Sequence, residues 1–468
     1  MNEPLVLRYT THTPERVAQI VQEISYSAPE SVGSRALDGS KNRLVWLSLW
    51  SIFAFEFFLG FVVPVEPGFT PVHLVSYVLI LSSYVFLFLA ARKQWQSGAL
   101  QRLPSISRQI WISMMIWGTY SALRILDFHD FRNFAYQWVA NNTNGIWLMP
   151  LAFIIGLSRS SLETTFRVIR TQTALGAVIM ALAFTLDYDR ALWASFSETS
   201  LIYGTGIMFL ISHRASWRVH SFWCFAFGIY GVGQFLLGLR NGLVRCAVYL
   251  FFYVVIQGID TFRGKVSYPK FLGICLVIVF IIIGTYGFIG LNPDASVSAG
   301  LSMYKITGMY DSRSANILEM LDSLSAIELF QGSWDGTYWS GIFNICRSDI
   351  EGGFFQFILR GGLVSLVIFI ILAFTALWKG LRADTGSMSF YLGLYILEHL
   401  IWMITYGNPG VNMDFILLWI AIGACLSGAG DFVIDETGLD HGQPPAEAGS
   451  KGFSEKARVY AYPRSVFE

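Results

Sequence analysis

Hydrophobic residues in this chain of 468 residues come in repeated runs close to 20 residues long, separated by polar segments. At about 1.5 Å per residue, a helix of about 20 residues crosses the hydrocarbon core of a bilayer, which is roughly 30 Å thick. Such runs occupy residues 45–65, 71–91, 109–126, 135–157, 171–187, 192–212, 217–238, 241–258, 271–291, 354–377, 388–406 and 411–428. None shows the alternation of apolar and polar residues that is typical of transmembrane β-barrels. The pattern predicts an all-α integral membrane protein with about twelve transmembrane helices.

Lys and Arg residues gather in alternate connections between these runs. They follow the second, fourth, sixth, eighth and tenth runs, as Arg92, Lys93, Arg102, Arg108, Arg159, Arg167, Arg170, Arg214, Arg218, Arg263, Lys265, Lys270, Lys379 and Arg382. The connections at 66–70 and 407–410 carry no basic residue. Because basic residues accumulate on the cytoplasmic side of a membrane, we expect both termini to be cytoplasmic.

One connection differs from the others in length. Residues 292–353 separate the ninth and tenth runs, on the side opposite the basic connections. Loops longer than about 15 residues in a compact protein are usually functional. We therefore expect transmembrane helices 1–9 within residues 43–291, an extracytoplasmic loop at 292–353, and helices 10–12 within residues 354–428. Residues 1–42 and 429–468 are predicted to be weakly structured cytoplasmic tails.

Composition supports the membrane assignment and excludes several classes of partner. The chain is 54% hydrophobic and only 14% charged, whereas soluble domains average about 25% charged residues. Its formal net charge is zero, so we expect membrane lipids and no nucleic acid as partners. The five cysteines form no CxxC pair and no acidic metal motif is visible. No metal and no other cofactor is expected.

The long loop contains a segment with helical periodicity. From Ser312 the chain reads SRSANILEMLDSLSAIELF, with apolar residues near helical spacing, and Ser312 or Ser314 could cap its start. The apolar face of this helix is expected on the membrane surface or on the end of the bundle. The helix leads into QGSWDGTYW, where Trp334 and Tyr338 could present aromatic faces to sugars. The alternative interpretation of these rings is an aromatic belt at the membrane interface.

Several arginines are expected on the side that should be poor in them. Arg240 and Arg245 lie at the outer ends of two predicted helices, Arg124 and Arg132 flank the third loop, and Arg313 and Arg347 flank the loop helix. A cluster of guanidinium groups suits a diphosphate, whose oxygens match the guanidinium fork. The alternative for any single one is a side chain that reaches the interface or a local ion pair.

The stretch from Arg240 to Gly362 resembles the O-antigen ligase/polymerase superfamily (Wzy-type polysaccharide polymerases and WaaL-like ligases). That superfamily has about twelve spans, a large external loop late in the chain, and a short S-R-x-G motif before the loop. Here the motif corresponds to Leu239-Arg240-Asn241-Gly242. The family's loop arginine, helix and P-L-F-G-x-G turn correspond to Arg313, the loop helix and the sequence ELFQG at 328–332. The closing motif corresponds to EGGFFQFILRGG at 351–362.

This resemblance implies an inverting glycosyl transfer at the outer face of the bacterial cytoplasmic (inner) membrane. An undecaprenyl-diphosphate-linked glycan would donate, and the hydroxyl of a second glycan would accept, for exopolysaccharide or O-antigen synthesis. Arginines would stabilise the leaving diphosphate without a metal. A chain-length regulator or an export complex is a further implied partner. Ligases of the superfamily carry a histidine in the closing motif, where this chain has Asp349 and Glu351, and this difference favours a polymerase of repeat units.

Two candidates for the catalytic base follow. Glu351 takes the place of the family's key polar residue, and its alternative is a solvated carboxylate at a helix N-terminus. Glu398 and His399 lie inside the eleventh run. Intramembrane ionisable residues are functional candidates, so His399 is the second candidate, with a mutually satisfied interior pair as the alternative. For Glu56 and Glu198 we expect packing against an interior arginine.

Three other functions stay open at this stage. The first is an O-antigen-type ligase that uses a lipid or protein acceptor. The second is a secondary transporter, since twelve spans are common among them. Major-facilitator proteins, which belong to this class, have two six-span halves and a G-x-x-x-D-R-x-x-R/K-type motif after the second span. This chain reads ARKQWQSG there and shows no two visible halves. The third is a flippase for the same lipid-linked glycan, which would not need a loop of this kind.

Overall fold

The structure is a computed structural model, and it describes residues 32–58, 71–125, 146–186, 204–236, 240–264, 267, 272, 312–341, 344–347, 350, 352–405 and 412–432. The longer helices are α2 (Val32–Phe57), α3 (Pro71–Gln96), α4 (Ser105–Ile125), α7 (Arg159–Leu186), α10 (Trp217–Leu236), α11 (Arg240–Phe262), α16 (Gly353–Arg382), α17 (Met388–Thr405) and α18 (Met413–Ser427). Shorter elements are the 3-10 turns η2 (Ala99–Arg102) and η5 (Met149–Leu151), α6 (Ala152–Gly156), α9 (Thr205–Ser212), α14 (Ser312–Ser323), α15 (Ala326–Gln331), β1 (Tyr338–Ser340) and β2 (Ile345–Arg347).

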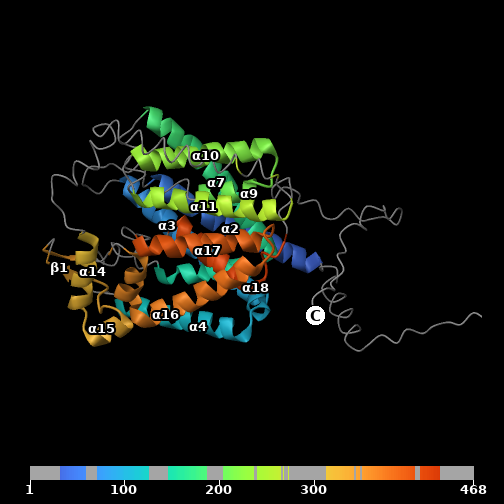
Figure 1. Ribbon diagram of the computed structural model, residues 1–468. Coiled ribbons are helices and arrows are strands. Elements are labelled where there is room, and N and C mark those ends of the chain that lie inside the picture. Colours follow the sequence, from blue (N-terminus) through green and yellow to red (C-terminus); the bar gives the residue numbers. More distant parts are fainter. Residues whose placement is uncertain are drawn as a thin grey trace, which may run out of the picture.

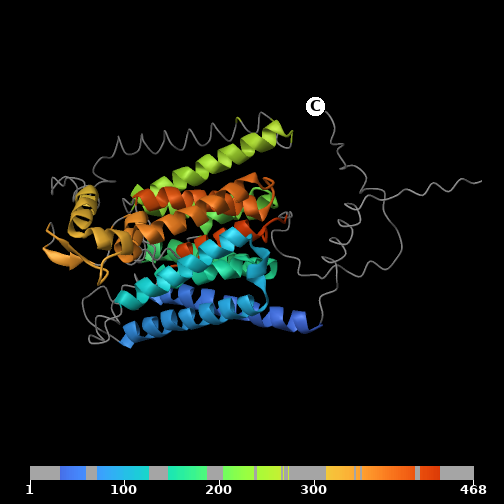
Figure 2. The ribbon, with the colours of Figure 1, turned by 90° about the horizontal axis from the view of Figure 1, so that it is seen from below.

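The long helices lie side by side in one bundle, with their axes roughly aligned (Figures 1 and 2). Four described helical segments have the length and apolar composition needed to cross a membrane, namely Leu74–Gln96, Arg159–Ala183, Val244–Phe262 and Gly353–Arg382. The helices α17 and α18 are apolar but shorter. The described part of the chain is thus an all-α bundle with helices that suit a membrane, apart from one small hairpin.

Two helices begin earlier than the hydrophobic runs predict. The fifth run, 171–187, is the end of α7, which starts at Arg159, so Arg167 and Arg170 lie within a helix and not in a loop. Charged residues limit an apolar run in the sequence. They can still belong to the helix, because long charged side chains can extend to water. Similarly, α2 starts at Val32, inside the predicted N-terminal tail. The ninth run, 271–291, lies almost wholly outside the described residues.

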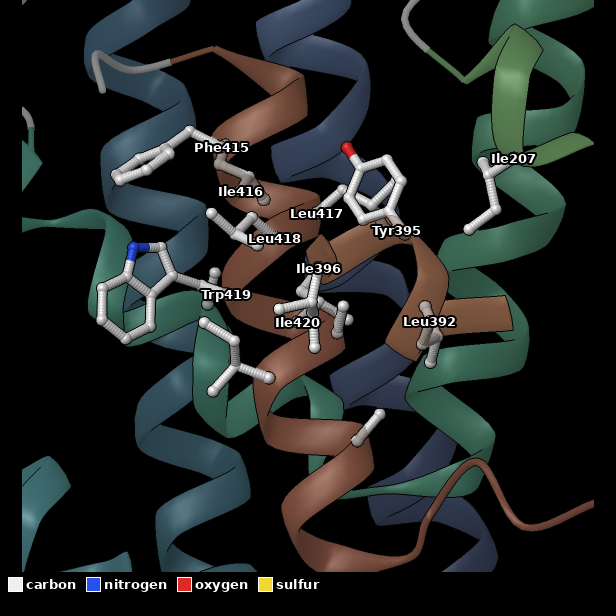
Figure 3. Packing of buried hydrophobic residues seen from close by; sticks show 14 of the residues in the cluster. Ile207, Leu392, Tyr395, Ile396, Phe415, Ile416, Leu417, Leu418, Trp419 and Ile420 are labelled. Carbon is white, nitrogen blue, oxygen red and sulfur yellow. The ribbon is translucent and has the colours of Figure 1, made fainter. Parts of the chain in front are cut away.

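The centre of the bundle is α18, the last helix that the structure describes. Every residue of α18 from Met413 to Leu426 is buried, and Figure 3 shows its side chains packed against Tyr395 and Ile396 of α17. The short helix α6 approaches α18 at two glycines: a Cβ on Gly156 would collide with the carbonyl oxygen of Ile420, and one on Gly423 with that of Phe153. Small residues allow such close backbone contact between membrane helices.

The described residues 312–341, 344–347 and 350, here called the loop segment, lie at one end of the bundle (Figures 1 and 2). Sequence periodicity predicted one helix from Ser312 to Phe330, but the structure has two, α14 and α15. They separate because Ser325 caps α15 in a capping box with Glu328. The hairpin of β1 and β2 follows, and the hydroxyl of Ser340 donates to Glu319 of α14 at 2.9 Å.

The opposite end of the bundle holds the basic connections. The side chain of Arg102 donates to the carbonyl oxygen of Leu157 at 3.4 Å, that of Arg263 to the hydroxyl of Thr385 at 2.8 Å, and that of Lys379 to the carbonyl oxygen of Leu426 at 3.0 Å. Each of these contacts joins two segments that are far apart in the sequence. The two ends of the bundle therefore differ, since one is basic and the other carries the loop segment.

Candidate functional site

A buried ion cluster joins three helices in the part of the bundle nearer the loop segment. Arg245 comes from the start of α11, Glu398 from α17, and Asp414 from the start of α18. The Nε of Arg245 donates to Glu398 at 2.6 Å, and one terminal nitrogen donates to Asp414 at 2.8 Å. All three side chains are almost fully buried. One guanidinium thus faces both carboxylates, and burying carboxylates without a nearby positive charge is unfavourable in an apolar interior.

Aromatic side chains surround this cluster. The hydroxyl of Tyr249 donates to Glu398 at 3.3 Å, and that of Tyr395 donates to a carboxylate oxygen of Asp414 at 3.3 Å. The guanidinium carbon of Arg245 lies 4.3 Å from the ring centroid of Trp402, a favourable cation–π arrangement. Hydroxyl groups and a ring face therefore contact the buried charges.

His399 extends the cluster by one residue. Its Nδ1 lies 2.7 Å from a carboxylate oxygen of Glu398 and 3.2 Å from the carbonyl oxygen of Tyr395. Its ring packs on that of Tyr395, with centroids 4.2 Å apart. Its Nε2 is buried and has no hydrogen-bond partner within the described residues. The interior Glu–His pair, which was the alternative interpretation of His399, is thus seen in the structure, although among the described residues the Nε2 of His399 has no partner.

Glu56 lies beside the same cluster, at the end of α2. Its carboxylate accepts the backbone N–H of Met413 at 3.1 Å, at the first turn of α18, where the helix dipole favours a negative charge. We expected an arginine beside Glu56, but within the described residues its hydrogen bond comes from this backbone amide. Glu198, for which we had the same expectation, lies outside the described residues.

Arg124 occupies the end of α4 and holds the loop segment in place. Its terminal nitrogens donate to the carbonyl oxygens of Gln331 at 2.6 Å, Ser333 at 2.8 Å and Arg360 at 3.2 Å. Its guanidinium carbon also lies 5.7 Å from the ring centroids of Tyr120 and Trp334. We predicted substrate binding for this residue, and the structure shows that its terminal nitrogens hold the turn after α15 against α16.

The turn that Arg124 holds is built around glycines and an aspartate. Gly332, Gly336 and Gly362 have positive φ angles of 93°, 69° and 70°, which only glycine adopts readily. Asp335 accepts hydrogen bonds from the hydroxyl of Ser333 at 3.0 Å and from the N–H of Thr337 at 2.9 Å. Burial alone would raise the pKa of Asp335, but its hydrogen bonds with Thr337 and Ser333 outweigh burial and hold that pKa below its usual value.

The remaining predicted site residues differ in exposure, and some of their side chains lie outside the described residues. Trp334 is 56% exposed, as a sugar-stacking or interfacial ring requires, but Tyr338 is only 3% exposed and packs with Met320, Ile350 and Leu359. The ring of Tyr338 therefore does not offer a face to a sugar. Arg240 is the first residue of α11 and Arg313 lies in the first turn of α14, but their side chains lie outside the described residues. So do Arg132 and Glu351.

Sequence reasoning gave no role to Arg360, which is a fully buried arginine in α16. A terminal nitrogen of its guanidinium lies under the turn of the loop segment, only 2.5 Å from where a Cβ on Gly336 would be. The available signal was a single charge inside the apolar sequence FFQFILRGG. Within the described residues, no group of three or more His, Cys, Asp or Glu side chains could hold a metal ion.

Comparison with known protein families gives no matching family model, and comparison with curated proteins gives no match either. The resemblance to the O-antigen ligase/polymerase superfamily therefore rests on the motifs between Arg240 and Gly362, and the function that it implies is a proposal.

Proposed function

We propose that this chain polymerises undecaprenyl-diphosphate-linked oligosaccharide repeat units at the outer face of a bacterial cytoplasmic membrane. The observation that carries the proposal is the asymmetry of the bundle. A folded loop segment packs on the end opposite the basic connections, next to the part of the bundle that holds the buried ion cluster. Basic residues mark the cytoplasmic side, so the loop segment faces outwards, where lipid-linked glycans are joined.

The proposed reaction needs an acceptor hydroxyl, a base and groups that stabilise a diphosphate. The hydroxyl oxygen attacks the anomeric carbon of the donor, the bond from that carbon to the diphosphate oxygen breaks, and undecaprenyl diphosphate leaves. The hydroxyl proton passes to the base, for which Glu351 and His399 remain the candidates. Inversion follows from this single displacement.

The structure changes how the arginines are assigned within this proposal. Arg245 and Arg124 already donate to protein oxygens, so a diphosphate could bind them only by displacing those acceptors. We assign both to holding the helices and the loop segment. Diphosphate binding is assigned to Arg240 and Arg313, which open α11 and α14, and Trp334 is the exposed ring available to a sugar.

A secondary transporter is the rival that a specific observation favours. Proton-coupled carriers use buried acidic and histidine side chains within their helices, and Glu398, His399 and Asp414 form such a group. A ligase shares the proposed chemistry and differs in its acceptor. The three functions predict different products, so one experiment separates them.

The test is the glycan made by a strain from which this chain has been deleted. A polymerase predicts single repeat units on the lipid, a ligase predicts full-length polymer that is missing from its final acceptor, and a transporter predicts no defect in chain length. Complementation with Arg240→Lys or Arg313→Lys, at matched protein level, should restore little polymer, because lysine keeps the charge but loses the bidentate fork. Normal chain length in both variants would remove the proposed diphosphate site.

A further inference from the structure

The surface formed by Ile327 and Phe330 is the apolar face of α15. The two residues are three positions apart, on one side of the helix, and are 64% and 59% exposed. The acidic residue of this helix, Glu328, does not break the face, because its carboxylate is engaged with the backbone N–H and hydroxyl of Ser325. Exposed apolar side chains that gather on one face can mark a site of contact with a membrane or another protein.

The position of α15 on the bundle is fixed by several hydrogen bonds. The hydroxyl of Tyr120 donates to the side-chain oxygen of Gln331 at 3.0 Å, and the N–H of Ser333 donates to the carbonyl oxygen of Leu359 at 2.8 Å. Gly332 and Gly362 bring the two backbones so close that a Cβ on either would collide with the other segment. Together with Arg124, these contacts fix the depth of α15 relative to α4 and α16.

That depth can be measured along the two helices from their basic ends. From Arg108 to Tyr120, α4 rises through twelve residues, or about 18 Å at 1.5 Å per residue. From Lys379 to Gly361, α16 covers eighteen residues, or about 27 Å on the same basis. Both lengths are shorter than the roughly 30 Å of hydrocarbon that a bilayer provides. Taking Arg108 and Lys379 as marks of the inner boundary, both levels fall short of the outer boundary, so α15 docks no farther out than the edge of the hydrocarbon region.

The apolar face of α15 is also continuous with the exposed apolar side of α4. Phe330 lies edge-on to Trp117, with ring centroids 6.4 Å apart, and Ile116 and Leu123 on α4 are both exposed. Trp117 and Tyr120 add the amphipathic rings that gather at membrane–water interfaces, beside Arg124.

We propose that α15 is an interfacial helix whose face, Ile327 and Phe330, contacts the acyl chains of phospholipids in the outer leaflet. The loop segment then contacts both the helical bundle and the bilayer, and its hairpin lies in water. In both overall views the hairpin lies at the edge of the loop segment, away from the bundle. This inference does not depend on glycosyl transfer.

The test uses the unmodified chain in phospholipid vesicles that contain a phosphatidylcholine with a diazirine in its acyl chain. Ile345 on the hairpin is the matched control, because at 54% it is about as exposed as Phe330. After irradiation and peptide mass spectrometry, we expect acyl adducts on Ile327 and Phe330 and none on Ile345. A water-soluble diazirine should give the reverse pattern. Labelling of α15 by the soluble reagent alone, or equal acyl labelling of Ile345, would overturn the proposal.

Discussion

At the level of single residues, Arg245 stabilises two carboxylates that are buried inside an apolar bundle. Its guanidinium donates to Glu398 and Asp414, which come from different helices. This ion cluster is weak evidence for net stabilisation, because the free energy lost when charges leave water is about as large as the free energy gained from their attraction. Removing only the cation is different, because both carboxylates then stay buried without the guanidinium that they share.

We therefore predict that Arg245→Ala destabilises the folded chain by about 3–5 kcal/mol, the range for breaking a buried ion pair. Combining it with Glu398→Gln and Asp414→Asn should recover much of this loss, since no uncompensated charge remains. Glu163→Gln is the control, because it removes an exposed pair with Arg159 and should change stability by less than about 1 kcal/mol. Thermal unfolding in detergent measures all of these variants. A triple variant no more stable than Arg245→Ala would show that charge compensation is not the cause.

A second prediction concerns the catalytic base. If Glu351 takes the acceptor proton, Glu351→Gln keeps its shape but should abolish polymer while leaving donor binding largely intact. A carboxylate that only caps a helix would tolerate glutamine at a loss below about 1 kcal/mol. His399→Ala, made in parallel, tests the nitrogen that has no partner within the described residues. Chain length on a gel decides: polymer from Glu351→Gln but none from His399→Ala moves the chemistry to α17.

The residue scale also shows what sequence can and cannot reveal. Arg245, Glu398 and His399 stand out individually, because each is ionisable within an apolar run. The pairing of Arg245 with Glu398 joins residues 153 positions apart, and no local pattern encodes it. For the same reason the expected arginine partner of Glu56 was replaced by a backbone amide on a helix that packs nearby.

Among the elements, α16 contains a break at Gly362, and the backbone of the loop segment packs against it. Gly362 has φ 70° and ψ −176° within an otherwise continuous helix, and a side chain there would collide with the carbonyl oxygen of Phe330. The glycine pair is visible in the sequence, but the break in the helix could not be predicted from it, because two glycines inside an apolar run are also typical of close helix packing. Ser325 and Glu328 form the capping box that divides α14 from α15, whereas apolar periodicity across these residues had predicted a single helix.

We predict that Gly362→Ala releases α15 from the bundle, since it combines an unfavourable φ with a backbone collision. The expected outcome is faster proteolysis within residues 312–341 and lower thermal stability, by a few kcal/mol in the range for strained backbone positions. Gly228→Ala is the matched control, because a Cβ there meets nothing within 4 Å, and alanine in a helix is favourable. Equal protection of the loop segment in Gly362→Ala would show that the break is dispensable.

At the scale of the whole molecule, the two ends of the bundle differ, and this difference predicts an orientation in the membrane. Hydrophobic runs and alternate basic connections predicted a helical membrane protein with its long loop on the non-basic side. The described helices agree with the helical membrane protein, and the side of the membrane on which the long loop lies stays a prediction. The number of spans remains a prediction of twelve, because length and apolar composition identify four described helices. Helices such as α18 are short and enclosed by protein, so their own hydropathy does not show how they sit in a bilayer.

Reporter fusions test this orientation directly. A fusion after Ser340 in the hairpin should report an extracytoplasmic position, whereas fusions after Ser97 and Ser267, which lie in basic connections, should report the cytoplasm. Alkaline phosphatase and a fluorescent protein make a suitable pair of reporters, since each is active on one side only. A cytoplasmic signal at Ser340 would place the loop segment on the wrong side for lipid-linked glycans and end the functional proposal.

The burial of α18 has a consequence for how the protein is made. Protein synthesis proceeds from the N-terminus, and α18 is the last described helix to leave the ribosome. The earlier helices must therefore enter the membrane around a centre that is still empty, with Gly156 and the side chains that later contact α18 facing lipid or one another. A chain that stops before Asn412 lacks its core and not merely its end. Cells should treat such a truncated chain as unassembled protein and degrade it, even though every earlier helix is present.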